Sequence, residues 1–145
     1  MKKVLPLLFG MFICMMPIAQ SVEPQVVVHD PWIRWLPGER PNSAAYMTLE
    51  SKSCGDLVLR AVTSVKVKTV EMHTMDNVDG KMTMRKVKEI RIKPGTQMEL
   101  KPGGLHLMIF GLPDSFKVGD KIDLTLKFAD GTFKTIYAVA KAPQE

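Results

Sequence analysis

Cysteine and histidine are both scarce in this sequence of 145 residues, which contains two cysteines and three histidines. Cys14 lies in an apolar run near the start, and Cys54 is alone in the rest of the chain, so an intramolecular disulfide there is excluded. We expect a lone cysteine of this kind to be buried and inert. No phosphate-binding glycine loop, no Gly-x-Ser-x-Gly turn and no catalytic carboxylate pair stands out, so we predict that the protein is not an enzyme.

Long hydrophobic runs are also missing, apart from a short one at the N-terminus. Basic residues precede this run, prolines interrupt it and small residues follow it: Lys2, Lys3, Pro6, Pro17, Ala19 and Ser21. The pattern predicts a cleaved signal peptide at residues 1–21 and a soluble, exported mature protein, with an uncleaved N-terminal anchor as the alternative. The residues before Cys14 lack the small side chains expected ahead of a lipid-modified cysteine, so we do not expect a lipoprotein.

Neither sign of charge dominates the chain. The net formal charge is +5, and it falls to +3 without the first 21 residues, which hold two lysines and no carboxylates. The remaining lysines are scattered and form no dense block, so we expect no nucleic-acid partner. A composition of 46% hydrophobic and 24% charged residues fits a single globular domain at residues 22–145.

Helical periodicity with capping residues is absent from every window of the sequence. Short β-rich runs alternate instead with turn signals of the Pro-Gly and Asp-Gly type. The run at 121–128 alternates strictly, which places four apolar side chains on one face: Ile122, Leu124, Leu126 and Phe128. We therefore predict an all-β fold of eight or nine strands, arranged as a β-sandwich or a small barrel.

Methionine is abundant by contrast, with 11 residues, and most of those after the first 21 positions fall between 72 and 108 together with two histidines. We interpret Met47, Met72 and Met98 as packing residues. An Asp-Gly turn at residues 79 and 80 predicts a hairpin between two of the β-like runs. Residues two apart on a strand share a face, and three pairs have this spacing: His73 with Met75, Met82 with Met84, and His106 with Met108.

If these residues form a cluster of imidazole and thioether groups, their chemistry distinguishes between copper and zinc as the bound metal. Thioethers are soft ligands that select Cu(I), whereas zinc sites usually recruit thiolates, carboxylates or more histidines. Two neutral imidazoles and two neutral thioethers also suit a monovalent ion, because a divalent ion would gain no charge compensation. The cluster therefore favours Cu(I) over Zn(II).

The spacing of four of these residues resembles a known motif. Ten residues separate His73 from Met84, twenty-one separate Met84 from His106, and one separates His106 from Met108. This resembles the H-x10-M-x21-H-x-M copper motif of the PCuAC-type periplasmic copper chaperones, and segments 44–49, 70–73 and 101–108 are similar to that family as well.

The resemblance covers most of residues 26–140 and implies a cupredoxin-like β-sandwich or small Greek-key barrel. It implies one Cu(I) per chain, held near the surface by His73, Met84, His106 and Met108. Met75 and Met82 are candidates for supporting groups or alternate ligands. Some family members carry a C-terminal tail rich in histidine and methionine, which residues 140–145 do not match, so no second copper site is expected.

The resemblance further implies a periplasmic metallochaperone that delivers copper, chiefly for the CuA centre of cytochrome c oxidase. Its partner would be a copper-accepting protein, such as an oxidase subunit or another copper chaperone. Three alternatives remain open: general copper buffering or tolerance, a blue-copper electron carrier, and an interaction sandwich in which the methionines only pack. A blue-copper site needs a cysteine thiolate with two histidines, and Cys54 has no histidine near it in the sequence.

Overall fold

The computed structural model describes residues 23–38 and 41–143, and all of its regular structure is β-strand. The strands are β1 (Val26–Arg34), β2 (Asn42–Ser51), β3 (Leu57–Thr63), β4 (Thr69–Val78), β5 (Lys81–Lys86), β6 (Ile90–Ile92), β7 (Gln97–Leu100), β8 (His106–Phe110), β9 (Lys121–Phe128) and β10 (Phe133–Lys141). Across those two segments, no helix long and apolar enough for a membrane crossing is found. The predicted signal peptide and its cleavage site lie outside the described residues.

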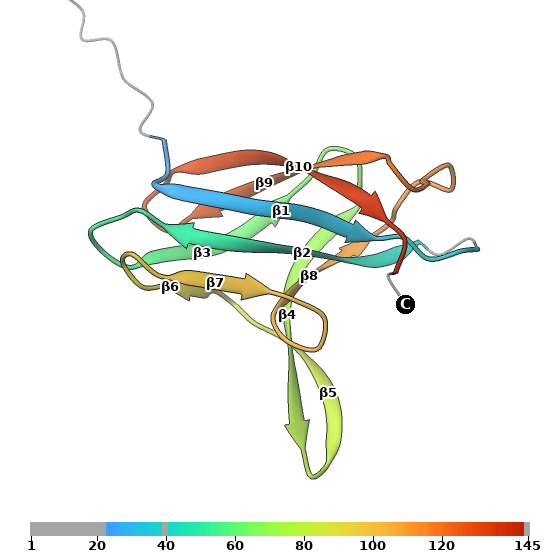
Figure 1. The fold of residues 1–145 in the computed structure, drawn as a ribbon, viewed down its shortest axis with the longest axis horizontal. Helices are drawn as coiled ribbons and strands as arrows, with labels where there is room; N and C mark the ends of the chain where they lie inside the picture. Colours follow the sequence, from blue (N-terminus) through green and yellow to red (C-terminus); the bar gives the residue numbers. More distant parts are fainter. Residues whose placement is uncertain (1–22, 39–40, 144–145) are drawn as a thin grey trace, which may run out of the picture.

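The strands form one mixed sheet in the order β5-β4-β8-β2-β1-β10-β9-β3-β6, with β7 paired to β2. Among the strands of the described residues, β1 and β10 pair in parallel, and the other pairs are antiparallel. β3 contacts β4 and β2 contacts β6, although these strands are far apart in the sheet order, so the sheet wraps around its own interior (Figure 1). The predicted all-β fold is confirmed.

Apolar side chains fill the interior of the wrapped sheet, and along the strands they alternate with side chains that face outward. On β9 the four apolar residues predicted to share a face are each no more than 5% exposed. Leu107 of β8 and Leu49 of β2 are fully buried in the same core. Burial of each such side chain stabilises the fold by about 1.5–3 kcal/mol. The structure has more strands than predicted because β6 and β7, with three and four residues, are too short to show an alternating pattern.

The hairpin of β4 and β5 stands out from the body of the molecule as an arm (Figure 1). Asp79 and Gly80 have φ values of 51° and 79°, and two positive φ angles define the type I′ turn that matches the twist of paired strands. The root of the arm, residues 69–73 of β4, is paired with β8 in the body, whereas all six residues of β5 are exposed. The predicted hairpin is confirmed, and it carries its side chains into solvent.

Gly111 is the glycine that the packing most strictly requires. Its φ is 74°, and a Cβ added there would lie 2.6 Å from the Cβ of Lys68 and 3.2 Å from its backbone nitrogen. We expect Gly111→Ala to lower the free energy of unfolding by about 2–4 kcal/mol, because backbone strain and a steric clash add. The matched control is Gly95→Ala, with φ 66° but open space around the new Cβ, which we expect to cost only about 1–2 kcal/mol. Urea unfolding of both variants tests this, and equal losses would contradict it.

Candidate metal centre

Two imidazoles lie side by side where the arm joins the body. β4 and β8 are antiparallel, and their register sets His73 directly opposite His106, with ring centroids 5.9 Å apart. His106 is 4% exposed and the side chain of His73 is 14% exposed. The sheet therefore brings together the two histidines that the sequence places in separate strands.

The hydrogen bonds of these rings leave one nitrogen of each imidazole free. Nδ1 of His106 lies 2.9 Å from the carbonyl oxygen of Gly104, which can only accept, so Nδ1 carries the proton and Nε2 keeps its lone pair. Nε2 of His73 lies 2.9 Å from a carboxylate oxygen of Glu71, so this nitrogen donates and Nδ1 keeps the lone pair. Metal-binding histidines are oriented in this way by a carboxylate or carbonyl on the other ring nitrogen.

The Nδ1 atom of His73 is buried and has no hydrogen-bond partner among the residues that the structure describes. A buried polar atom left unpaired costs about 1–3 kcal/mol, so such atoms are rare unless a ligand satisfies them. A metal ion with an affinity for imidazole would satisfy this nitrogen. The residues present therefore fit a metal ion between the two strands.

Glu71 belongs to this arrangement, although the sequence analysis did not select it. Its carboxylate accepts a hydrogen bond from Nζ of Lys86 at 2.7 Å as well as the one from His73. The hydrogen bond from Lys86, and after it the one from His73, hold the pKa of Glu71 below its usual value, so the carboxylate stays ionised. Glu71 lies two residues before His73 on β4, and the alternation of a strand was the available signal.

The thioethers line a cavity of about 280 Å³ next to His106. Met108 follows His106 on the same face of β8, and Met75 and Met84 are cross-strand partners on the arm; all four residues line the cavity. His73 is not among the lining residues, but its ring is the strand neighbour of His106. Three of the four predicted ligands thus share one cavity, and the fourth adjoins it.

Met82 is the candidate residue that lies apart from the cavity. It pairs with Asn77 farther out on the arm and is 55% exposed, whereas Met75 lines the cavity wall. The other methionines behave as interpreted: Met47 and Met72 are buried in the core, and Met98 packs against it. The three methionines interpreted as packing residues therefore lie in or against the core.

An aromatic group that the sequence analysis did not assign closes the other side of the histidine pair. The ring of Tyr46 lies 6.4 Å from that of His106 and 4.6 Å from that of Trp32, and the guanidinium of Arg34 lies 5.4 Å above its centroid. Burial raises the pKa of Tyr46, and the positive charge of Arg34 partly offsets this. Tyr46 is 4% exposed, so this group shields His106 from solvent.

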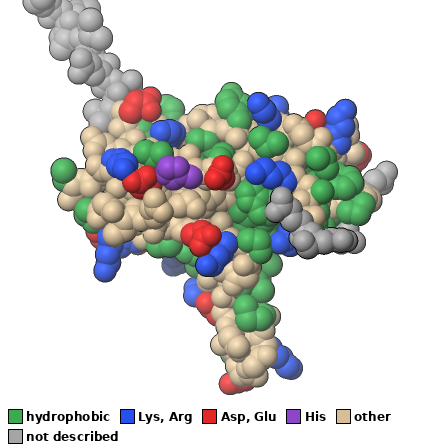
Figure 2. Space-filling model, in the orientation of Figure 1, with side chains coloured by type: hydrophobic (Ala, Val, Ile, Leu, Met, Phe, Trp, Pro, Cys, Tyr) green, Lys and Arg blue, Asp and Glu red, His purple; other side chains and the backbone are tan. Residues whose placement is uncertain are grey.

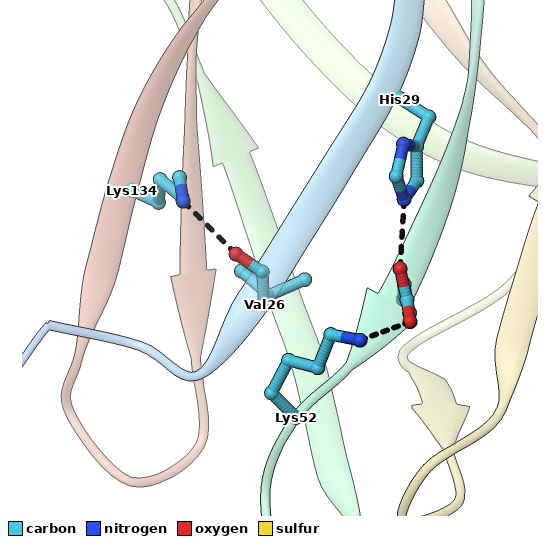
Figure 3. Close-up of polar contacts among 5 residues, drawn as sticks. Val26, His29, Lys52 and Lys134 are labelled. Carbon is cyan, nitrogen blue, oxygen red and sulfur yellow. Dashed lines mark hydrogen bonds and ion pairs between the residues drawn. The ribbon is translucent and has the colours of Figure 1, made fainter.

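The remaining histidine and the cysteine lie elsewhere. His29 and Lys52 both contact the carboxylate of Glu50 on the outer surface (Figure 3), which is the surface hydrogen bonding expected of an isolated histidine. Cys54 is exposed, so the expectation of a buried thiol was wrong. It lies in the short connection between β2 and β3, which has no core of its own to bury the thiol.

Across the described segments, no cluster of three or more histidine, cysteine or carboxylate side chains is placed to hold a metal ion. The centre that the structure does contain is a pair of oriented imidazoles flanked by thioethers. Imidazole and thioether groups together form a donor set that suits a soft metal ion.

Residues 26–139 match the LpqE-like family, and the chain belongs to this family. It is 30% identical over 100 residues to Lxx21020 of Leifsonia xyli subsp. xyli, a protein named as a lipoprotein, in a match that spans 68% of this chain and 60% of the relative. It is 30% identical over 118 residues to RP573 of Rickettsia prowazekii (strain Madrid E), which is named as uncharacterized, over 77% of this chain and 65% of the relative. The matched region is thus less than two thirds of the length of either relative.

Solved structures share the fold. The copper-bound PCuAC domain from PmoF2 aligns with a TM-score of 0.69 at 21% identity, covering 84% of this chain and 97% of that domain. DR1885 from Deinococcus radiodurans in its Cu(I) form aligns with a TM-score of 0.61 at 28% identity, covering 85% and 81%. The chain thus belongs to the LpqE-like family and shares the fold of the PCuAC domains, as the resemblance predicted.

Proposed function

We propose that this protein is a Cu(I)-binding metallochaperone, with one ion per chain as its cargo. The observation that carries the proposal is the buried, unpartnered Nδ1 of His73, whose ring lies 5.9 Å from that of His106 between centroids. Met108 and Met84 would supply the other two ligands from the wall of the adjacent cavity. All four donors are neutral, which suits a monovalent ion, and two proteins with this fold have been solved with copper.

The chain's own residues divide into those that hold the ion firmly and those that expose it. His106 is buried, and its ring is fixed by Gly104 and covered by Tyr46. Met84 is 47% exposed and stands on the arm, where a partner can reach it. A carrier needs both properties, because it must retain copper in transit and release it on contact.

We propose further that the protein delivers copper in the periplasm to an accepting protein, such as a cytochrome c oxidase subunit during CuA assembly or another copper chaperone. The motif spacing supports this, and copper buffering is the second candidate. Deleting the gene should lower oxidase activity at limiting copper and leave it intact with added copper. Unchanged oxidase activity with increased copper sensitivity would favour buffering instead.

Glu71 provides a test of how His73 is held. We expect Glu71→Gln to lower the Cu(I) affinity by about tenfold, since removing a carboxylate behind a metal-bound histidine typically costs 10–100-fold. Glu99→Gln is the matched control, because Glu99 lies on β7 and pairs only with Lys101 at the surface. Competition with a Cu(I) chelator measures both, and equal affinities for the two variants would show that Glu71 does not orient the ring.

Export provides a separate test. The basic and apolar N-terminal pattern supports cleavage after about 21 residues, and membership in a family named for a lipoprotein supports export as well. We expect the intact mass of the cellular protein to equal that of residues 22–145 within a residue or two. A full-length mass would contradict cleavage, and a chain that starts at Cys14 with an attached lipid would show that the protein is a lipoprotein.

A further inference from the structure

Three thioethers share one face of the arm. Met75 and Met84 are direct cross-strand partners, and Met82 lies two residues before Met84 on β5. Cross-strand partners share a face, and so do residues two apart on a strand. The same face continues along β4 to His73, so the thioethers lead from solvent to the imidazoles.

Packing in the core does not explain why Met82 is a methionine, nor why the methionines of the arm lie on one face of it. Met82 is 55% exposed and has Asn77 as its cross-strand partner, whereas the core methionines Met47 and Met72 are at most 6% exposed. The opposite face of β5 carries Lys81, Thr83 and Arg85, while Lys86 lies on the methionine face at the root of the arm, opposite His73. Hydrophobic side chains continue from the body onto the arm in Figure 2. The arm therefore presents a methionine face to solvent.

The spacing allows these thioethers to converge on one ion. Directly opposed Cβ atoms are about 5 Å apart, and diagonal neighbours about 7–8 Å. Residues two apart on a strand are separated by about 7 Å. An unbranched methionine side chain with three rotatable bonds can close gaps of this size. Three thioethers form a soft, uncharged ligand set that selects Cu(I).

We propose that Met75, Met82 and Met84 form a second Cu(I) position, made of thioethers alone, through which the ion enters and leaves the histidine centre. This inference rests on the proposed function. Met84 belongs to both positions, so the chain still carries one ion at a time. The ion moves inward by exchanging its bonds to Met75 and Met82 for bonds to His73, His106 and Met108. Copper remains Cu(I), and no electron or proton is transferred.

The decisive variant removes the histidine centre and keeps the arm. In the full mature chain with His73→Ala and His106→Ala, titration with Cu(I) under reducing conditions should show one residual ion, bound more than about 100-fold more weakly than in the native chain. Adding Met82→Leu should weaken this residual binding by at least about tenfold. Adding Met98→Leu, a methionine that packs against the core, should leave it unchanged.

A kinetic measurement tests the role in transfer. In the otherwise native chain, Met82→Leu should slow copper loss to a Cu(I) chelator by about tenfold. Residual binding that is absent, or that does not respond to Met82→Leu, would overturn the inference, and so would an unchanged release rate. If the native chain still bound Cu(I) tightly in that case, the second position would be wrong but the proposed function would stand. Weak, Met82-dependent binding already in the native chain would instead contradict the histidine centre and support the arm position.

Discussion

His106→Ala is expected to weaken Cu(I) binding by more than about 100-fold, because it removes a ligand, and even a residue behind a ligand is worth 10–100-fold. The Nε2 of His106 is the free nitrogen of a ring that Gly104 holds in place, and no other imidazole lies near enough to His73 to replace it. The ring is buried, so some stability is lost as well. Chelator competition gives the affinity, and thermal unfolding confirms that the variant is folded under the assay conditions.

His29→Ala is the matched control, because it also removes an imidazole but from the pair with Glu50 on the outer surface. Its Cu(I) affinity should equal that of the native chain. The double variant Met84→Leu with Met108→Leu should lose affinity as strongly as His106→Ala, since leucine fills the space without a sulfur atom. Full affinity in this double variant would show that the thioethers assigned here are not ligands.

Cu(I) affinity is expected to fall as the pH is lowered, because protons compete with the ion for the imidazole nitrogens. Each imidazole must be neutral to bind the ion, whereas thioethers do not titrate. With both His73 and His106 as ligands, up to two protons are displaced per copper, so the affinity should fall by up to about two orders of magnitude per pH unit at low pH. Where both imidazoles are neutral, the affinity should not change with pH.

The ionisation of Glu71 does not contribute to this pH dependence of the Cu(I) affinity. The hydrogen bonds from Lys86 and His73 lower its pKa in the folded protein, so its stabilising contribution is fully present above the unfolded value of 4.5 and is lost only as the pH falls below it. The carboxylate therefore stays ionised between pH 5 and 9.

Alternative ligand sets give different profiles over the same range. A site with one histidine would show a limit of one proton per copper. A thiolate site that used Cys54 would keep gaining affinity at higher pH, because the thiol must lose its proton to bind the ion. A rise between pH 7.5 and 8.5 that disappears in Cys54→Ser would overturn the two-histidine, two-methionine assignment.

The hairpin was predictable because its signals are local. The Asp79-Gly80 turn sets the register of β4 and β5, and strand alternation then places Met75 and Met84 on one face. The pairing of β4 with β8 joins segments about thirty residues apart, and only the motif spacing suggested that His73 meets His106. Short strands such as β6 carry too few residues for a periodic signal.

Side chains whose role depends on tertiary neighbours were not predictable. The cover formed by Trp32, Tyr46 and Arg34 requires β1 and β2 to be aligned across a bulge, which no local pattern specifies. The buried nitrogen of His73 becomes a sign of metal binding only once Glu71 is seen to occupy the other ring nitrogen. The exposure of Cys54 follows from its place in a short connection.

X-ray absorption at the copper edge of the Cu(I)-loaded protein tests the central claim most directly, because it counts nitrogen and sulfur neighbours of the ion. We expect two nitrogen and two sulfur neighbours in the native chain, and loss of the sulfur contribution when Met84 and Met108 are both replaced by leucine. A shell without sulfur in the native protein, or a sulfur contribution unchanged in the double variant, would contradict binding by His73, Met84, His106 and Met108.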